Sequence, residues 1–192
     1  MSKHVCIVYH SGYGHTAKQA EAIHAGAASV DGVESSIIEV SALFDAEAEA
    51  WKQLDAADAI VMGSPTYMGT ASADFKKFME LTSQRWMEQK WAGKLAAGFT
   101  NSGSQNGDKQ TTLFQLVTFA AQHSMLWVSL GMMPGNNHSG GSVDDRNRLG
   151  ASIGAMAQSN VDAGPDVAPT KADLDTAHAF GAHVAACALR WN

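Results

Sequence analysis

The order of apolar segments constrains the fold of this 192-residue chain more than any other feature. Five short apolar runs, residues 5–9, 36–40, 59–62, 95–100 and 125–130, alternate with longer stretches of helical spacing. The runs have the length of strands and are continuously apolar, which is typical of strands buried on both faces of a parallel sheet. Strands that alternate with helices favour right-handed crossovers. The sequence therefore predicts an α/β fold, a three-layer αβα sandwich around a five-stranded parallel sheet.

Helical spacing between these runs supports the same architecture. Apolar side chains recur three and four positions apart within residues 20–30, 75–82, 113–120 and 174–188. The last segment follows Pro169 and opens with Thr170 and Asp173, which have the spacing of a capping box. Residues 131–168 form one long irregular stretch rich in Gly, Asn, Asp and Ser. Such a stretch is usually a lid, a subunit contact or a disordered segment.

Composition excludes several classes of function. The formal net charge is -6 and 45% of the residues are hydrophobic, so neither nucleic acid nor a membrane surface is expected as a partner. Cys6 and Cys187 lie far apart inside apolar runs, which does not suggest a disulfide. The first residues lack the features of a signal peptide and no run is long enough to span a bilayer, so we expect one cytoplasmic domain over residues 1–192. The histidines lack metal-ligand spacing, and we expect no metal.

The loop after the first run has the composition of an anion site. Its residues are Ser11, Gly12, Tyr13, Gly14, His15 and Thr16, and a helix is expected to begin directly behind them. Backbone N–H groups and the dipole at a helix N-terminus attract a phosphate. Because the loop contains no Lys or Arg and lacks a GK[ST] ending, it suits a terminal monophosphate and is not a P-loop. Gly12, Gly14 and Ala17 also match the dinucleotide pattern G-x-G-x-x-A, and Glu39 stands where a ribose ligand would lie.

Two further loops distinguish these alternatives. The second loop contains Pro65, Thr66, Tyr67 and Met68, and the third contains Ser102, Gly103, Ser104, Gln105, Asn106 and Gly107. In an open α/β sheet ligands bind beyond the carboxyl ends of the strands, so the three loops are expected to meet. Flat side chains, hydroxyls and backbone N–H groups suit the edges of an isoalloxazine ring. A site for a dinucleotide alone has no need of three such loops, so the sequence favours FMN.

Four short motifs stand in a fixed order along the chain. They are Ser11-Gly12-Tyr13-Gly14-His15, residues 64–69, Trp86 with the later Gly93-Lys94-Leu95, and Gln122-His123-Ser124-Met125. Their order and spacing resemble the WrbA-type NAD(P)H:quinone oxidoreductases of the flavodoxin-like superfamily, whose corresponding motifs are Ser-x-Tyr-Gly-His, Thr-Pro-Thr-Arg-Phe-Gly, a Trp before Gly-Lys-Leu, and His-His-Gly-Met. The resemblance covers nearly the whole chain, and it implies a flavodoxin-like sheet with strand order 2-1-3-4-5.

The resemblance also implies roles for individual residues. It places FMN on residues 11–16, 66–68, 102–107 and His123. Tyr13 would meet the nicotinamide of NAD(P)H, Trp86 would face a quinone, and His123 would supply a proton or a hydrogen bond near the flavin. Tyr67 stands where the family has Arg, and Gln122 stands where it has the first His. Trp86 and His123 also have purely structural interpretations, as a packed side chain and as a helix-terminal cation.

The resulting prediction is a flavin-dependent enzyme of the NAD(P)H dehydrogenase (quinone) class. Hydride would pass from NAD(P)H to FMN and on to a quinone, with both substrates using one pocket in turn, and the chain is expected to form a homodimer or homotetramer. Two alternatives stay open. One is a flavodoxin-type electron carrier without substrate turnover, which would have acidic residues around the flavin, and the other is an NAD(P)H-dependent FMN reductase.

Overall fold

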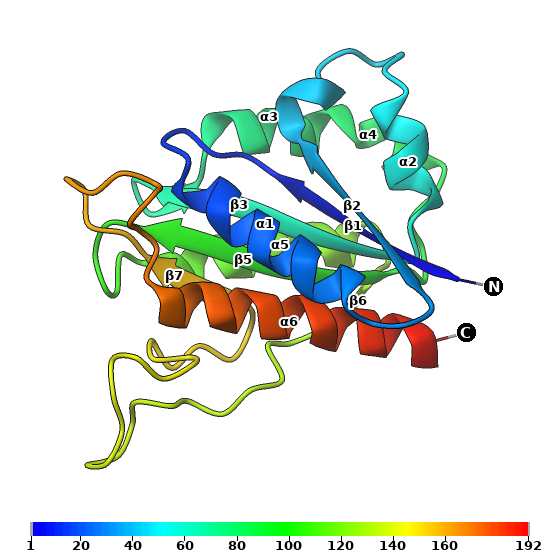
Figure 1. Cartoon of the computed structure of the whole chain (residues 1–192). Helices are drawn as coiled ribbons and strands as arrows, with labels where there is room; N and C mark the ends of the chain where they lie inside the picture. Colours follow the sequence, from blue (N-terminus) through cyan, green and yellow to red (C-terminus); the bar gives the residue numbers. More distant parts are fainter. Residues whose placement is uncertain (1, 192) are drawn as a thin grey trace.

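The computed structural model describes residues 2–191 and contains one central parallel sheet (Figure 1). The strands that form it are β1 Lys3–Tyr9, β2 Val33–Glu39, β3 Ala59–Tyr67, β5 Leu95–Ser102, β6 Leu126–Trp127 and β7 Ala155–Gln158. Their order across the sheet is β2-β1-β3-β5-β6, and β7 also pairs with β5. With β6 and β7 counted as two halves of a fifth strand, the predicted strand order 2-1-3-4-5 is confirmed.

The fifth strand departs from the prediction. The apolar run 125–130 contains only the two-residue strand β6, which pairs with Leu95 and Ala96 at the start of β5. The chain then leaves the sheet, because the backbone N–H of Leu130 bonds to Ser152 and Gly131 turns with a positive φ of 66°. It returns as β7 beside the end of β5, inside the stretch that was expected to be wholly irregular. β7 has the sequence AMAQ, which lacks the β-branched residues that signal a strand.

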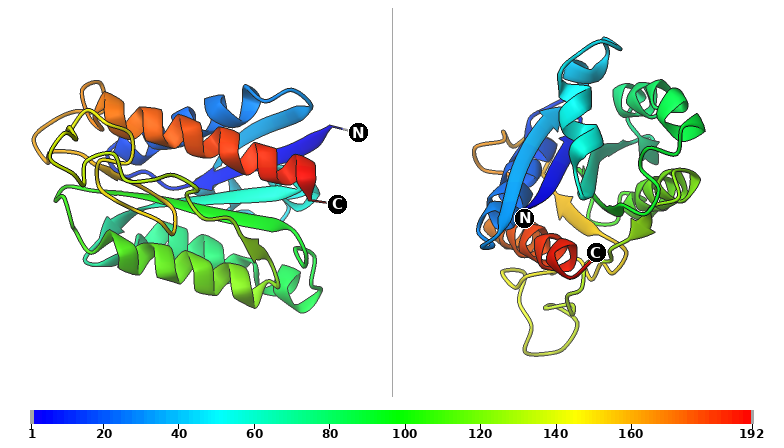
Figure 2. Two further views of the ribbon diagram at one scale, coloured as in Figure 1. Left: turned by 90° about the horizontal axis from the view of Figure 1, so that it is seen from below. Right: turned by 90° about the vertical axis from the view of Figure 1, so that its right-hand side faces the viewer.

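Helices cover both faces of the sheet, as Figure 2 shows. One face carries α1 His15–Ala28 and α6 Lys171–Arg190, and the other carries α3 Ala73–Leu81 and α5 Lys109–Gln122. The shorter elements η1 Val40–Leu43, α2 Ala50–Ala56 and α4 Ser83–Met87 accompany the second face. The predicted helices are present, and the predicted cap of α6 is formed because the side chain of Thr170 accepts from the backbone N–H of Asp173. The expected second strand ends one residue early, since Val40 begins η1.

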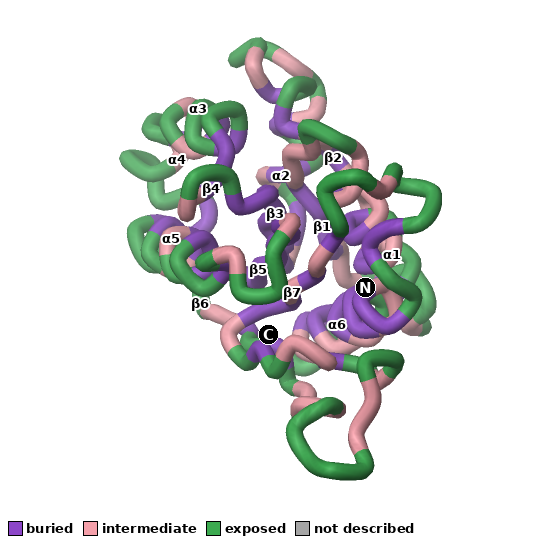
Figure 3. Tube along the Cα trace, turned by 90° about the vertical axis from the view of Figure 1, so that its left-hand side faces the viewer, coloured by how far each residue is buried: buried purple, intermediate pink, exposed green. Residues whose placement is uncertain are grey.

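The two faces of each central strand enter two separate cores. In β1, Val5 and Ile7 pack against α1 and α6, whereas Cys6 and Val8 pack with the aromatic side chains of the opposite face. This is why the strand sequences are continuously apolar rather than alternating. In Figure 3 the strands run buried through the middle of the molecule, and exposed loops gather at the edge that faces the viewer.

That edge holds the carboxyl ends of β1, β3, β5 and β7. The end of β3 is folded back by a tight turn at Met68 and Gly69, both with positive φ, and pairs antiparallel with β4 Thr70–Ala71. The first, second and third loops of the sequence prediction therefore meet at one place. Among residues 2–191, no helix is long and apolar enough to cross a membrane.

Candidate cofactor site

A cavity of about 570 Å³ lies at the carboxyl edge of the sheet. Its lining residues are Ser11, Tyr13, His15, Thr16, Pro65, Thr66, Tyr67, Asn101, Ser102, Gly103, Ser159, Val161, Ala163, Gly164 and Pro165. All three predicted loops contribute to it. Its volume is within the range of roughly 300–1,000 Å³ that is usual for small-molecule sites.

The first loop forms an anion cradle at the N-terminus of α1. Gly14 adopts a left-handed conformation with φ of 87°, and its carbonyl accepts the first helical bond from Lys18 at 3.1 Å. The backbone N–H groups of His15 and Thr16 precede that bond, so they have no partner within the helix. The hydroxyl of Ser11 accepts the N–H of Ala17 at 3.1 Å, and its own proton stays available to a ligand. The cradle therefore offers N–H groups and hydroxyls without a Lys or Arg side chain.

Two tyrosines flank the mouth of the cavity. Tyr13 is 76% exposed, and its ring meets that of Tyr67 edge-on with centroids 6.2 Å apart. The Tyr67 ring lies against the first loop, so that a Cβ at Gly12 would come within 2.5 Å of the phenol oxygen. Partial burial raises the pKa of Tyr67, which keeps the phenol neutral. Met68 is fully exposed beyond this pair and does not line the cavity.

Buried hydroxyls hold the second loop in place. The side chain of Thr66 is bonded to Thr100 at 2.8 Å and to Thr112 at 2.7 Å, which ties the end of β3 to β5 and to α5. These bonds occupy the hydroxyl of Thr66, and they fix Pro65, Thr66 and Tyr67 as a rigid wall of the cavity.

The third loop is only partly directed at the cavity. Ser102 and Gly103 line it, whereas Gln105 and Asn106 line a separate cavity beside residues 149–153. Ser104 and Gly107 line neither. Gly107 has a positive φ of 56°, and a Cβ there would lie 2.1 Å from the Ser102 hydroxyl. The loop is therefore folded tightly on itself, and only its first half faces a ligand.

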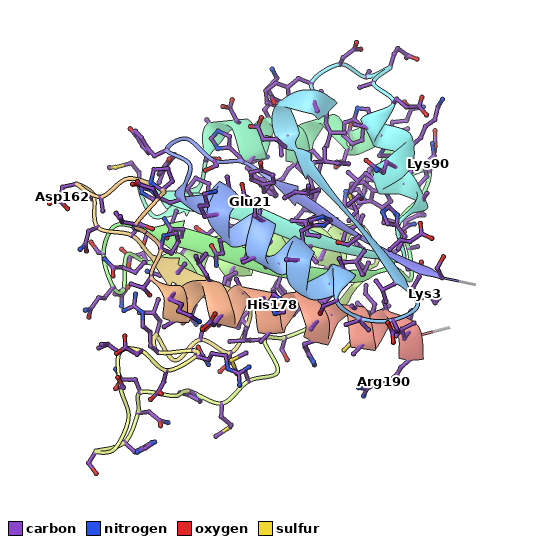
Figure 4. All side chains as sticks on the ribbon, viewed as in Figure 1. Lys3, Glu21, Lys90, Asp162, His178 and Arg190 are labelled. Atoms are coloured by element: carbon purple, nitrogen blue, oxygen red, sulfur yellow. The ribbon has the colours of Figure 1, made fainter. Side chains whose placement is uncertain are left out.

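One wall of the cavity was missed by the sequence prediction. The segment that follows β7 supplies Ser159, Val161, Ala163, Gly164 and Pro165, and Figure 4 shows Asp162 at its outer tip. Hydrogen bonds join this segment to the predicted loops, from Ser159 to the Asn101 side chain at 3.0 Å and between the His15 ring and the Ala163 carbonyl at 2.8 Å. The only available signal was the length and polarity of the irregular stretch, which does not identify individual residues.

The structure does not bring Trp86 and His123 to the cavity of the same chain. His123 is 2% exposed at the far end of α5, a helix whose 14 residues span about 21 Å. Its ring packs against Trp91 and bonds to Thr82 at 2.9 Å, and burial lowers its pKa to about 4. Trp86 lies on α4 and is 48% exposed. The expectation that they wall this pocket is therefore not met within one chain, because the third loop precedes the N-terminus of α5 whereas His123 follows its C-terminus and shares the contact residue Thr82 with Trp86.

Comparison with known proteins decides the family. The profile of the NADPH-dependent FMN reductases matches residues 10–137, which include all three loops. The chain belongs to this family. Flavodoxin FldP of Pseudomonas aeruginosa is 44% identical over 96% of both chains, and an NAD(P)H dehydrogenase (quinone) of Syntrophobacter fumaroxidans is 32% identical over 97% of both. The crystal structure of a flavodoxin, WrbA-like protein from Agrobacterium tumefaciens superimposes with a TM-score of 0.78, at 40% identity over 100% of both chains.

These comparisons confirm the predicted WrbA-type, flavodoxin-like family. At the level of the family they also confirm an oxidoreductase that uses FMN, with NAD(P)H as the electron donor. The assignment of individual site residues is not tested by them and stays a prediction.

The cavity fits FMN by its own chemistry. Within residues 2–191, the residues that line the cavity include no Asp, Glu, Lys or Arg. A phosphate there would therefore be held by N–H groups, hydroxyls and the dipole of α1. The two tyrosine rings flank the mouth beside the first loop, and the backbone of Gly103 approaches the segment after β7 closely, because a Cβ there would lie 2.6 Å from Val161. A polar phosphate cradle and two aromatic rings in one cavity match a phosphorylated aromatic cofactor.

Proposed function

We propose that this protein holds FMN in the cavity at the carboxyl edge of the sheet and transfers electrons from NAD(P)H to quinones. The observation that carries the proposal is the combination, in one cavity, of a phosphate cradle without Lys or Arg and an open aromatic mouth at Tyr13 and Tyr67. The name of the Syntrophobacter relative, NAD(P)H dehydrogenase (quinone), supports this choice of substrates.

In this proposal the residues of the phosphate cradle bind FMN and take no part in electron transfer. The N–H groups of His15 and Thr16 and the hydroxyls of Ser11 and Thr16 would hold the FMN phosphate, and Thr66, Ser102 and Gly103 would contact the ring. Bound FMN supplies the redox chemistry, because it can take two electrons and one proton as hydride from the nicotinamide and return them to a quinone, which takes a second proton from solvent.

In this proposal Tyr13 and Tyr67, at the mouth of the cavity, orient the nicotinamide and the quinone. Tyr13 and Tyr67 present ring surface next to the opening, and aromatic side chains favour stacked or edge-on contact with other rings. The opening is shared, so the nicotinamide has to leave before a quinone can enter. His123 is assigned no step within one chain, because its side chain is buried at the C-terminal end of α5, away from the cavity.

Steady-state kinetics test the shared mouth. Initial rates measured over a grid of NADH or NADPH and benzoquinone concentrations should give parallel double-reciprocal lines, since the product of the first half-reaction leaves before the second substrate binds. Intersecting lines would mean that both substrates occupy the protein together, and they would contradict a single shared mouth.

The alternative function, a flavodoxin-type electron carrier, is favoured by the name of the Pseudomonas relative. A carrier that docks onto a redox partner is expected to have charged residues around its cofactor. Among residues 2–191, the cavity lining includes no Asp, Glu, Lys or Arg, and Asp162 and Asp166 lie beside it on the segment after β7. Turnover of NAD(P)H with a quinone by the purified protein distinguishes the enzyme from the electron carrier, because only the enzyme catalyses it. A protein that accepts electrons only from a protein partner would be a carrier.

We further propose that the chain assembles into a homodimer or homotetramer. Beside the cavity, α3 and α5 enclose an apolar groove of about 680 Å³ that includes Tyr67, Met79 and Phe114, and Phe114 is 50% exposed. Exposed apolar surface of this kind marks interaction sites. A role for Trp86 at a cavity would require that a second copy present it. Light scattering of the purified protein should give twice or four times the mass of 20.3 kDa, and a monomer would contradict this proposal.

A further inference from the structure

Lys109 is a buried cation directly behind the wall of the cavity. It is the first residue of α5, its side chain is among the largest that are fully buried, and the residue is 1% exposed. Its ammonium group does not reach the cavity itself. Nζ donates to the Ser102 hydroxyl at 2.8 Å, to the Ser104 carbonyl at 2.8 Å and to the Gln105 carbonyl at 2.9 Å. The three donors are therefore satisfied by neutral oxygens of the third loop.

No carboxylate forms an ion pair with Lys109 among residues 2–191. The acid that influences it most is Asp173, but Arg148 holds that carboxylate with two bonds of 2.8 Å, and the backbone N–H of Gln158 adds a third at 2.9 Å. The charge of Asp173 is thus already balanced by a buried partner. Lys109 stays as an uncompensated positive charge in an interior of low dielectric, which is costly unless a negative charge comes close.

The bonds of Lys109 also determine what the third loop presents to the cavity. The carbonyls of Ser104 and Gln105 point inward to the ammonium group. The hydroxyl of Ser102 accepts from Lys109 and donates to Ser104 at 3.0 Å, so its dipole is oriented by the same charge. Ser102 lines the cavity, and one hydroxyl separates the ammonium group from the ligand space. The positive charge therefore acts on the cavity through Ser102 without contacting the ligand.

We propose that Lys109 is a positioning residue that stabilises the negative charge on the cofactor after reduction and thereby raises its reduction potential. The inference rests on the proposed function, because it requires FMN in the cavity. Hydride transfer from NAD(P)H adds two electrons and one proton to the flavin and leaves NAD(P)+, so the bound ring gains one unit of negative charge. A fixed cation near that charge favours the reduced state over the oxidised state. Burial lowers the pKa of Lys109 to about 8, so the side chain is still mostly protonated at neutral pH.

The competing explanation is that Lys109 only holds the loop together. A purely structural role would affect both redox states of the cofactor alike, because the shape of the loop is the same for each. An electrostatic role affects the reduced state selectively. The dissociation constants of oxidised FMN and of reduced FMN separate the two explanations. Their ratio fixes the reduction potential of bound FMN relative to free FMN.

The test uses full-length protein loaded with FMN and three variants at this position. Lys109→Met removes the charge and the donors, Lys109→Gln keeps a neutral donor, and Lys109→Arg keeps the charge. Lys52→Met, at an exposed lysine paired with Glu49, is the matched control for loss of a surface charge. The readouts are the affinity for oxidised FMN, by fluorescence titration, and the two-electron potential of the bound flavin, by equilibration with a reference dye.

We expect Lys109→Met and Lys109→Gln to weaken binding of reduced FMN at least tenfold more than binding of oxidised FMN, which lowers the two-electron potential by at least about 30 mV. Lys109→Arg should have a potential close to that of the wild-type protein, and Lys52→Met should have the wild-type potential and the wild-type affinity for oxidised FMN. Equal weakening of both redox states, or an unchanged potential in the neutral variants, would overturn the inference and leave the proposed function intact. A wild-type protein that takes up no FMN would overturn the proposed function as well.

Discussion

At the scale of single residues, the loop before α1 depends on the conformation of one glycine. Gly14 has the positive φ that the turn into α1 requires, and a Cβ there would lie 2.9 Å from Pro165. Its role could be predicted because short polar and glycine residues before a helix have a local meaning. Val161 and Pro165 could not be predicted, because they reach the cavity only through the tertiary path of the chain after β7.

Substitution of the cradle hydroxyls should weaken FMN binding. Ser11→Ala and Thr16→Ala each remove a hydroxyl that lines the cavity, and a charge-assisted hydrogen bond to phosphate is worth about 1.5–3 kcal/mol. The double variant should therefore lose at least tenfold in affinity by fluorescence titration with FMN. Ser41→Ala, at an exposed serine bonded to Glu39, is the control. Unchanged affinity in the double variant would place the phosphate elsewhere.

The burial of His123 predicts a pH dependence of stability. Its pKa is lowered by burial from 6.5 to about 4, so the unfolded chain binds a proton more readily than the folded one in this interval. The contribution of the neutral ring to stability is fully present above about pH 6.5. It falls as the pH decreases towards 4, with a slope that approaches roughly 1.4 kcal/mol per pH unit. Urea unfolding at several pH values should show a smaller slope in His123→Gln, and an identical slope would contradict this account.

At the scale of helices and strands, the sequence predicted most of what is local. The central strands β1, β3 and β5 and the helices α1, α3, α5 and α6 were predicted because each has a continuous or periodic apolar pattern. β3 extends to Tyr67, five residues beyond the predicted run, because residues 63–65 pair with β5 and residues 66–67 pair with β4. The split of the fifth strand could not be predicted, since the four residues of β7 owe their conformation to pairing with β5.

The crossing of α1 and α6 depends on two glycines. A Cβ at Gly26 would lie 1.9 Å from the carbonyl oxygen of His178, and one at Gly181 would lie 2.0 Å from that of Ile23. Helix propensity alone would make Gly181→Ala stabilising by about 1 kcal/mol. We expect the opposite, a loss of roughly 1–3 kcal/mol from overpacking against backbone, measured by urea unfolding. A more stable variant would show that the helices can move apart at little cost.

At the scale of the whole molecule, the closed phosphate end of the cavity predicts selectivity for FMN. Pro165 packs over Gly14, and the His15 ring bonds to the carbonyl of Ala163, so the segment after β7 lies against the cradle, where an adenosine attached to the phosphate would have to displace it. Apoprotein titrated with FMN and with FAD should bind FMN at least tenfold more tightly. Equal or tighter binding of FAD would mean that this segment opens.

The central claim is that one cavity accepts hydride from a nicotinamide and passes it to a quinone. The most direct measurement is the absorbance of the FMN-loaded protein when it is mixed without oxygen first with NADH or NADPH and then with benzoquinone. Our account predicts that the flavin absorbance is lost with at least one of the two donors and returns in full when one equivalent of quinone is added. A holoprotein whose flavin is reduced by neither nucleotide would contradict it and would favour the electron-carrier function.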